Sequence, residues 1–396
     1  MTGTSSSSKE QARSPSADGS SAKPAPATGL EGVVVAQTSI STIDGSAGKL
    51  SYRGYDIHDL AEHSTFEETA FLLWEGRLPD RGELEAVRRE LREQRALPPE
   101  AVALLESAPR QSNPMAVLRT ITSAIALTDP DADDNAQPAL RRKAVRLTAQ
   151  LGPIVAGFHR HRQGAARLEP REHLDYAGNF LYLLNGREPT PEEARIFDVC
   201  LILHADHGFN ASTFSARVTV ATLSDIYSGV TSALGTLKGS LHGGANEAVM
   251  KMLLELQGSG ESPEDAIRRR LERKEKISGF GHRVYKTEDP RATHLRRFSE
   301  ELGSQRGDGT LFEMSRRIEA FMRAEKDIYS NVDFYSASTY YQLGIPTDLF
   351  TPIFAMSRVA GWTAHVMEQL ANNRLIRPRS EYVGERNLRY VSLEQR

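Results

Sequence analysis

The stretch Gly239-Ser240-Leu241-His242-Gly243-Gly244-Ala245-Asn246 is where the interpretation of this chain begins, because it sets one histidine among small residues. A Gly-Gly pair after a histidine lets the backbone come close to whatever the imidazole contacts, since no Cβ stands in the way. The apolar residues that follow, at positions 248, 249, 252 and 253, indicate the start of a helix. His242 would then lie at a helix entrance, where free backbone N–H groups favour a neutral imidazole. The alternative is a capped turn with a satisfied polar histidine.

Composition is typical of a globular enzyme. The 396 residues are 39% hydrophobic and 26% charged, with a formal net charge of -3, and the length suggests roughly two to three domains. This charge balance gives no electrostatic argument for nucleic acid or membrane as a partner. The single cysteine, Cys200, excludes an intrachain disulfide. No apolar run approaches the roughly 20 residues of a membrane span, and no signal-peptide core is present, so we expect a cytoplasmic protein.

The N-terminal part predicts a tail followed by a β hairpin. Residues 1–29 contain almost no large apolar side chains, so we expect a disordered tail. The residues from Gly32 to Tyr52 favour β structure, beginning at Val33-Val34-Val35. Asp44-Gly45 is a strong turn signal, and Lys49–Arg53 would be the returning strand.

From about Thr65 onward the pattern turns helical. The residues after Thr65 share an apolar face up to Gly76, and Thr190-Pro191-Glu192-Glu193 is a capping box with proline at the first helical position. The same chemistry recurs in three later openings, at Ser262-Pro263, Asp289-Pro290 and Thr351-Pro352. The chain is therefore predicted to be mainly α with a small β hairpin near its start.

Histidines are also paired in the segment His204-Ala205-Asp206-His207. His204 and His207 are i, i+3 neighbours on a helix, a spacing that could bind a metal if a third ligand were supplied. This leaves open a metal-dependent hydrolase. In the other interpretation, His204 is a core histidine and His207 donates a hydrogen bond to a substrate.

A third histidine lies in a glycine-rich segment, Ile277-Ser278-Gly279-Phe280-Gly281-His282-Arg283-Val284-Tyr285-Lys286. Alternating glycines can present backbone N–H and C=O groups to a ligand, and Lys286 and Arg291 can meet anionic groups. The segment is not a dinucleotide-binding fingerprint, because no βαβ unit surrounds it.

The C-terminal third offers a carboxyl group and several arginines. Asp333 is flanked by apolar residues, so burial would raise its pKa and its basicity, although it could equally be a helix N-cap. Arg358 belongs to an apolar helix, and burying its charge unpaired is costly, so we expect a carboxylate from the protein or from a substrate to pair with it. Arg377 and Arg379, in isolation, would be salt-bridge residues.

Taken together and in this order, these segments resemble the citrate synthase family, from about Gly29 to Gly384. The resemblance implies an almost all-α, intertwined homodimer with the hairpin of bacterial members. It further implies a large helical domain formed by residues 30–242 and 345–396. A small helical domain, residues 243–344, would close over the site.

The resemblance also implies roles for individual residues. Asp333 would remove a methyl proton from acetyl-CoA, His242 would stabilise the enol, and His282 would protonate the carbonyl of oxaloacetate. No metal and no tightly bound cofactor would be required, because acetyl-CoA is a cosubstrate. The resemblance also assigns oxaloacetate binding to His207, Arg291, Arg358 and Arg377, the last of which would reach in from the partner protomer. It assigns coenzyme A binding to Ile277, Gly279, Gly281, Lys286 and Asn331.

Two alternatives stay open at this point. A close relative, 2-methylcitrate synthase, uses propionyl-CoA with the same catalytic residues. Relatives that use propionyl-CoA often carry Arg-Pro-Ser where this chain has Arg377-Pro378-Arg379, which favours citrate synthase. A non-enzymatic helical scaffold would leave His242, His282 and Asp333 scattered over distant surfaces.

Overall fold

The computed structural model describes residues 28–30 and 32–396. The described residues form two units, and the smaller one contains residues up to Gln37 together with Arg377–Arg396. Its only regular elements are the short 3-10 helices η1 (Thr28–Leu30) and η4 (Leu393–Gln395). The predicted tail, residues 1–29, lies outside the described residues except for its last two positions, so its disorder stays a prediction.

The larger unit, Thr38–Ile376, begins with a three-stranded antiparallel sheet in the order β1 (Ser41–Asp44), β2 (Lys49–Tyr52) and β3 (Tyr55–Asp56). The turn follows Asp44 as predicted, and the Asp44 carboxylate accepts hydrogen bonds from the N–H groups of Ser46 and Ala47 at 3.0 and 2.9 Å. The prediction that β structure begins at Val33 is wrong. Val33, Val34 and Val35 are 44, 87 and 41% exposed and lie outside the strands, because a run of valines needs covered faces that nothing supplies here.

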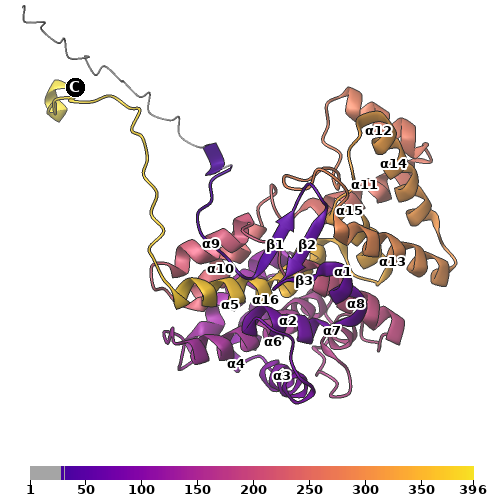
Figure 1. Ribbon diagram of the computed structural model, residues 1–396, viewed down its shortest axis with the longest axis horizontal. Helices are drawn as coiled ribbons and strands as arrows, with labels where there is room; N and C mark the ends of the chain where they lie inside the picture. Colours follow the sequence, from indigo (N-terminus) through magenta and orange to yellow (C-terminus); the bar gives the residue numbers. More distant parts are fainter. Residues whose placement is uncertain (1–27, 31) are drawn as a thin grey trace, which may run out of the picture. The chain divides into compact units, whose positions relative to one another are not determined.

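The described residues contain sixteen α-helices, which confirms the mainly α prediction. Eleven of them build the body of the larger unit (Figure 1): α1 (Ile57–His63), α2 (Phe66–Glu75), α3 (Arg81–Gln94), α4 (Pro99–Ser107), α5 (Pro114–Ala124), α6 (Gln137–Arg162), α7 (Tyr176–Asn185), α8 (Pro191–His204), α9 (Ala211–Val220), α10 (Ile226–Leu237) and α16 (Phe350–Ala371). Short 3-10 turns, η2 (Ile125–Thr128) and η3 (Thr347–Leu349), precede α6 and α16.

The other five helices are α11 (Ala245–Ser259), α12 (Pro263–Glu272), α13 (Pro290–Arg306), α14 (Thr310–Lys326) and α15 (Val332–Gln342). They pack largely on one another, and the orange helices α12 and α14 lie together at one end of the unit in Figure 1. The division into a small domain, 243–344, and a large one, 30–242 with 345–396, remains a prediction. No helix in the part of the chain that the structure describes is long and apolar enough to cross a membrane.

Most of the predicted helix starts are confirmed by their caps. Thr190 and Glu193 exchange the two hydrogen bonds of a capping box, at 3.1 and 3.0 Å. Ser262 and Asp289 are N-caps whose side chains accept backbone N–H groups. The prediction for Thr351 is wrong, because α16 already begins at Phe350 without a side-chain cap. The Thr351 hydroxyl instead donates a 2.9 Å hydrogen bond to the Gly243 carbonyl, and so holds the segment that carries His242.

Helix α16 is the centre of the core. It packs against α2, α6, α8, α9 and α10 and is buried along almost its whole length. A helix that is apolar all round can be stable only when other elements surround it. The polar side chains that α16 does carry are therefore enclosed, and Arg358 is one of them.

Candidate active site

The end of α8 and the middle of α16 approach each other unusually closely. A Cβ on Gly361 would lie 2.3 Å from the Ala205 carbonyl oxygen, so only glycine fits there. The Gly361 N–H donates to that same oxygen at 3.2 Å. One turn earlier on α16, Arg358 Nε donates a 2.6 Å hydrogen bond to the carbonyl oxygen of His204.

Arg358 is a buried cation without an acidic partner. Its side chain is 1% exposed, its Nη2 has no hydrogen bond, and none of the described carboxylates forms an ion pair with it. The guanidinium instead lies over the Phe354 ring, 4.6 Å from its centroid. Burial lowers the pKa of Arg358 to about 10, a value at which it is still charged at neutral pH. Asp206 and Asp333 are close enough to act on this charge, but neither pairs with it, so an anionic ligand would gain from binding here.

Arg291, in the first turn of α13, is a second buried cation, but this one is paired. Its Nε and Nη2 donate to the Asp289 carboxylate at 2.9 and 2.8 Å. Asp289 also accepts the Val332 N–H at 3.2 Å and so ties α13 to the start of α15. Burial alone would lower the pKa of Arg291, but Asp289 outweighs it and holds that pKa above its ordinary value. Nη1 of Arg291 forms no hydrogen bond with a described residue and stays free to donate.

His282 has its ring orientation and tautomer set by the backbone. Its Nδ1 accepts the N–H groups of Val284 and Tyr285 at 3.0 and 3.1 Å, so the proton of the neutral ring must lie on Nε2. Burial, and then the charge of Arg291, lower the pKa of His282 to about 4. The side chain is therefore a neutral Nε2–H donor at physiological pH.

His207 lies against His282. The two ring centroids are 5.2 Å apart in an edge-to-face arrangement, and His207 Nε2 is 3.2 Å from the Tyr285 hydroxyl. Burial, and then the charge of Arg291, lower the pKa of His207 well below its ordinary value. His207 is thus a neutral group between the two histidine-bearing segments.

His242 precedes α11, as predicted, and α11 begins at Ala245. Its Nε2 is 2.8 Å from the Ser212 hydroxyl, which also accepts the indole N–H of Trp362 at 3.2 Å. Burial and then the charge of Arg358 lower the pKa of His242 to about 4. With its pKa lowered by burial and by Arg358, the imidazole is neutral at physiological pH.

Asp333 is the second residue of α15. The N-cap is Asn331, whose side chain accepts the Asp333 N–H at 3.0 Å, so the interpretation of Asp333 as a capping aspartate is wrong. Burial raises the pKa of Asp333 to about 6, against the opposing charges of Arg291 and Arg358. A carboxyl group that titrates near neutrality is suited to act as a general base.

These groups share the same charged neighbours. Arg358 acts on the pKa of His242, Arg291 acts on that of His282, and both act on that of Asp333. The two arginines also influence each other. His242, His282 and Asp333 are therefore each close enough to one or both of these buried arginines to feel their charge, as a shared site requires.

The predicted coenzyme A residues border this centre. The amide N–H of Asn331 donates to the Gly279 carbonyl and its side chain donates to the Gly281 carbonyl, both at 2.9 Å. Gly279 and Gly281 have φ values of +83° and +76°, which favour glycine. Ile277 is buried and Lys286 exposed. A cavity of about 170 Å³ is lined by Gly281, His282, Tyr285, Lys286, Thr287, Asp289 and residues 327–330.

The geometry gives no support to a role of Arg377 at this centre or to His204 as a metal ligand. Arg377 belongs to the smaller unit, so its place beside this centre stays a prediction. His204 Nδ1 is 2.7 Å from the Cys200 carbonyl within α8, as expected of a core histidine. Among residues 28–30 and 32–396, no group of three or more His, Cys, Asp or Glu side chains is placed to hold a metal ion.

Some residues of the site had no predicted role. Tyr285 lies inside the quoted segment 277–286, Ser212 follows His207 by five residues, and Asp289 was expected only to cap a helix. The hairpin contributes as well, because the Ser41 hydroxyl donates to Asp206 and the Lys286 N–H donates to the Gly45 carbonyl at 2.8 Å. Spacing along the sequence carries no signal for these contacts between distant segments.

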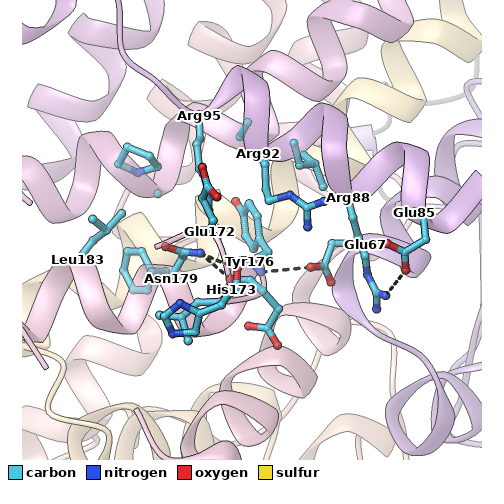
Figure 2. Close-up of a pocket in the computed structure, with 17 residues that line it drawn as sticks. Glu67, Glu85, Arg88, Arg92, Arg95, Glu172, His173, Tyr176, Asn179 and Leu183 are labelled. Atoms are coloured by element: carbon cyan, nitrogen blue, oxygen red, sulfur yellow. Dashed lines mark hydrogen bonds and ion pairs between the residues drawn. The ribbon is translucent and has the colours of Figure 1, made fainter. Parts of the chain in front are cut away.

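A separate cavity of about 300 Å³ lies between α3, α6 and α7 (Figure 2). Arg88 and Arg92 of α3 and Arg95, just after that helix, line it together with Glu67 and Tyr176. None of the predicted site residues contributes to its wall. It is therefore distinct from the charged centre formed by α8, α13, α15 and α16.

Comparisons with known proteins point in one direction. Residues 29–379 match the family model described as citrate synthase, C-terminal domain. Citrate synthase 2 of Bacillus subtilis is 53% identical over 93% of this chain and 98% of its own length. The 2-methylcitrate synthase of Shewanella oneidensis is 44% identical, covering 92% and 96%. The ternary complex of citrate synthase from Thermoplasma acidophilum with carboxymethyl coenzyme A and oxaloacetate aligns with a TM-score of 0.87 at 34% identity, covering 93% and 98%.

Proposed function

Because the chain belongs to the citrate synthase family, we propose that it condenses acetyl-CoA with oxaloacetate and hydrolyses the resulting citryl-CoA to citrate and CoA. The observation that carries this proposal is the unpaired guanidinium of Arg358, which is buried beside two neutral imidazoles and a carboxyl group of raised pKa. That arrangement fits an anionic substrate and proton transfer at carbon.

Oxaloacetate would bind first at the arginines. Its two carboxylates suit Arg358, which lacks an acidic partner, and the free Nη1 of Arg291. His207 would add a neutral donor. Arg377 would reach in from the partner protomer, so that a homodimer completes the site.

Proton removal from the acetyl methyl group would follow. Asp333 acts as the base, and its raised pKa of about 6 gives it more basicity than an exposed carboxylate has. His242 stabilises the enol by donating a hydrogen bond to the thioester oxygen. The Ser212 hydroxyl lies 2.8 Å from Nε2 of His242 and holds the ring in place.

Carbon–carbon bond formation would then use His282. As the enol carbon attacks the oxaloacetate carbonyl, the Nε2–H of His282 protonates the developing alkoxide. The backbone N–H groups of Val284 and Tyr285 hold the other ring nitrogen, so the donor stays aimed at one side. Water then cleaves the citryl thioester, and the CoA thiol leaves.

Coenzyme A would lie along the segment that includes Ile277, Gly279 and Gly281, whose two glycines have positive φ values. Asn331 and Lys286 would complete this contact. No resident cofactor or metal takes part in the proposed reaction.

We also propose that the small domain, 243–344, closes on the large one and that the enzyme works in the cytoplasm.

A 2-methylcitrate synthase is the second candidate, because a protein of that name is 44% identical to this chain. The catalytic groups would be the same, and one methylene in an acyl pocket is worth only about 1–3 kcal/mol. The higher identity, 53%, to a citrate synthase favours acetyl-CoA.

Purified protein would be assayed for thiol release with oxaloacetate and either acetyl-CoA or propionyl-CoA, with the product identified by mass spectrometry. We expect oxaloacetate-dependent release and a higher kcat/KM for acetyl-CoA. A higher value for propionyl-CoA would favour the second candidate. The absence of release with both thioesters would contradict the proposed function.

A further inference from the structure

Tyr285 contacts both histidines on the oxaloacetate side of the candidate site. Its hydroxyl lies 3.2 Å from His207 Nε2, and its backbone N–H donates to His282 Nδ1 at 3.1 Å. Its ring centroid is 4.7 Å from that of His282 and 5.6 Å from that of His207. No other described side chain is hydrogen-bonded to the His207 ring.

The hydrogen bond between Tyr285 and His207 can be arranged in two ways. If His207 Nε2–H donated to the phenol oxygen, the phenol proton would have no acceptor among the described residues, which is unfavourable for a buried hydroxyl. If the phenol donates to Nε2, the phenol proton has an acceptor, and the His207 proton lies on Nδ1. Nδ1 has no hydrogen bond to a described residue and is therefore free to donate to a ligand.

Tyr285 is itself held from the other side by the β1–β2 turn. The neighbouring Lys286 N–H donates to the Gly45 carbonyl at 2.8 Å. A Cβ on Gly45 would lie 2.2 Å from the Val284 carbonyl oxygen, so the turn can approach this backbone only with glycine there. The hairpin thereby fixes the segment from which Tyr285 reaches His207.

We infer that Tyr285 is a positioning residue whose phenol sets the proton of His207 on Nδ1 and whose backbone N–H, together with that of Val284, keeps the proton of His282 on Nε2, so that both imidazoles donate to the same anionic substrate. The phenol acts on His207 and the amide acts on His282. This inference rests on the proposed function for the identity of that substrate, oxaloacetate. The tautomers themselves do not depend on it.

The test compares the wild type with Tyr285→Phe by nitrogen-15 NMR of histidine-labelled protein, with the His207 signal assigned by its loss in His207→Gln. The wild type should show His207 protonated on Nδ1, and Tyr285→Phe should shift it toward Nε2. His282 should stay protonated on Nε2 in both, because the amide at position 285 is unchanged. Tyr341→Phe, which alters an exposed tyrosine, is the matched control and should leave both rings unchanged.

Kinetics give the second measurement. Losing one oriented donor should raise the KM for oxaloacetate about tenfold in Tyr285→Phe, with little change in kcat or in the KM for acetyl-CoA. A His207 ring that carries its proton on Nε2 in the wild type, or an unchanged tautomer in Tyr285→Phe, would overturn the inference. If the protein showed no turnover at all, the proposed function would fail, but the NMR comparison would still decide the role of Tyr285.

Discussion

Arg358 Nε donates a 2.6 Å hydrogen bond to the carbonyl oxygen of His204, while Nη2 of the same guanidinium has no partner in the described chain. One end of the side chain is therefore fixed and the other is left unsatisfied. Arg291 differs, because Asp289 neutralises it through two hydrogen bonds. The contrast identifies Arg358 as the position where an anionic substrate gains most from binding.

Replacing Arg358 by methionine should abolish substrate binding without unfolding the protein. The substitution removes a costly unpaired charge and one hydrogen bond, so the free energy of unfolding should change by no more than about 1 kcal/mol. The increase in melting temperature that oxaloacetate causes in the wild type should disappear. An Arg358→Met protein that oxaloacetate stabilises as much as the wild type would contradict this role.

Arg217→Met is the matched control for that experiment. Arg217 is also buried, but it is paired with Glu368 at 2.7 Å and hydrogen-bonded to Gln369. Removing Arg217 takes a charged partner from Glu368, whose side chain is 21% exposed, and from buried Gln369, which costs about 2 kcal/mol. Denaturant unfolding of the two variants should therefore show a large loss of stability for Arg217→Met only.

The pH dependence of kcat/KM should follow Asp333 on the acid side. Burial raises the pKa of Asp333 to about 6 and lowers those of His242 and His282 to about 4. Between these values the imidazoles stay neutral while the base becomes protonated, so kcat/KM should fall about tenfold per pH unit below about pH 6. A profile that stays flat until about pH 4 would remove Asp333 as the titrating group.

Ser212 should matter through His242. Ser212→Ala deletes the hydroxyl that lies 2.8 Å from His242 Nε2, so the ring loses the contact that fixes its orientation. We expect kcat to fall by about 10- to 100-fold with an unchanged KM for oxaloacetate. Ser215→Ala, whose hydroxyl is bonded to Ser232, should retain wild-type kcat. Equal losses in the two variants would indicate a general packing effect instead.

Gly361 should be essential for the packing of α16 on α8. A methyl group there would lie 2.3 Å from the Ala205 carbonyl oxygen, and overpacking a core typically costs about 1–3 kcal/mol. Gly258, in α11, has nothing within 4 Å of the same position, so Gly258→Ala should stabilise the protein by about 0.5–1 kcal/mol. Equal unfolding midpoints for Gly361→Ala and the wild type would contradict the close contact.

The parts of the fold that local chemistry determines were predictable from the sequence. The capping box at Thr190 and the helix entrance after His242 depend on neighbouring residues, and both are confirmed. The start of the β structure at Val33 was not predictable, because three consecutive valines satisfy a strand pattern whether or not a partner strand exists. Thr351 has the composition of an N-cap, yet its hydroxyl is used by Gly243, more than one hundred positions away in sequence.

The candidate site divides in the same way. The side chains proposed to react, at positions 242, 282 and 333, were recognisable from short motifs. The groups that contact and orient the histidines of the site were not. Ser212 reaches His242 from 30 residues away, and Tyr285 reaches His207 from 78. Tertiary packing decides these contacts, as it decides that Asp289 binds Arg291 on two atoms. The pKa shifts depend on burial, so the sequence pattern indicates the direction of a shift but not its size.

The central claim is that Asp333 removes the proton that begins the condensation, and the most direct test is oxaloacetate-dependent thiol release from acetyl-CoA by the wild type and by Asp333→Ala. Folding of the variant would be checked by its unfolding midpoint and by its binding of oxaloacetate at the unaltered Arg358. Asp333→Ala should bind oxaloacetate normally and lose about 10³-fold or more in kcat. A folded variant whose kcat stays within about tenfold of the wild type would contradict it.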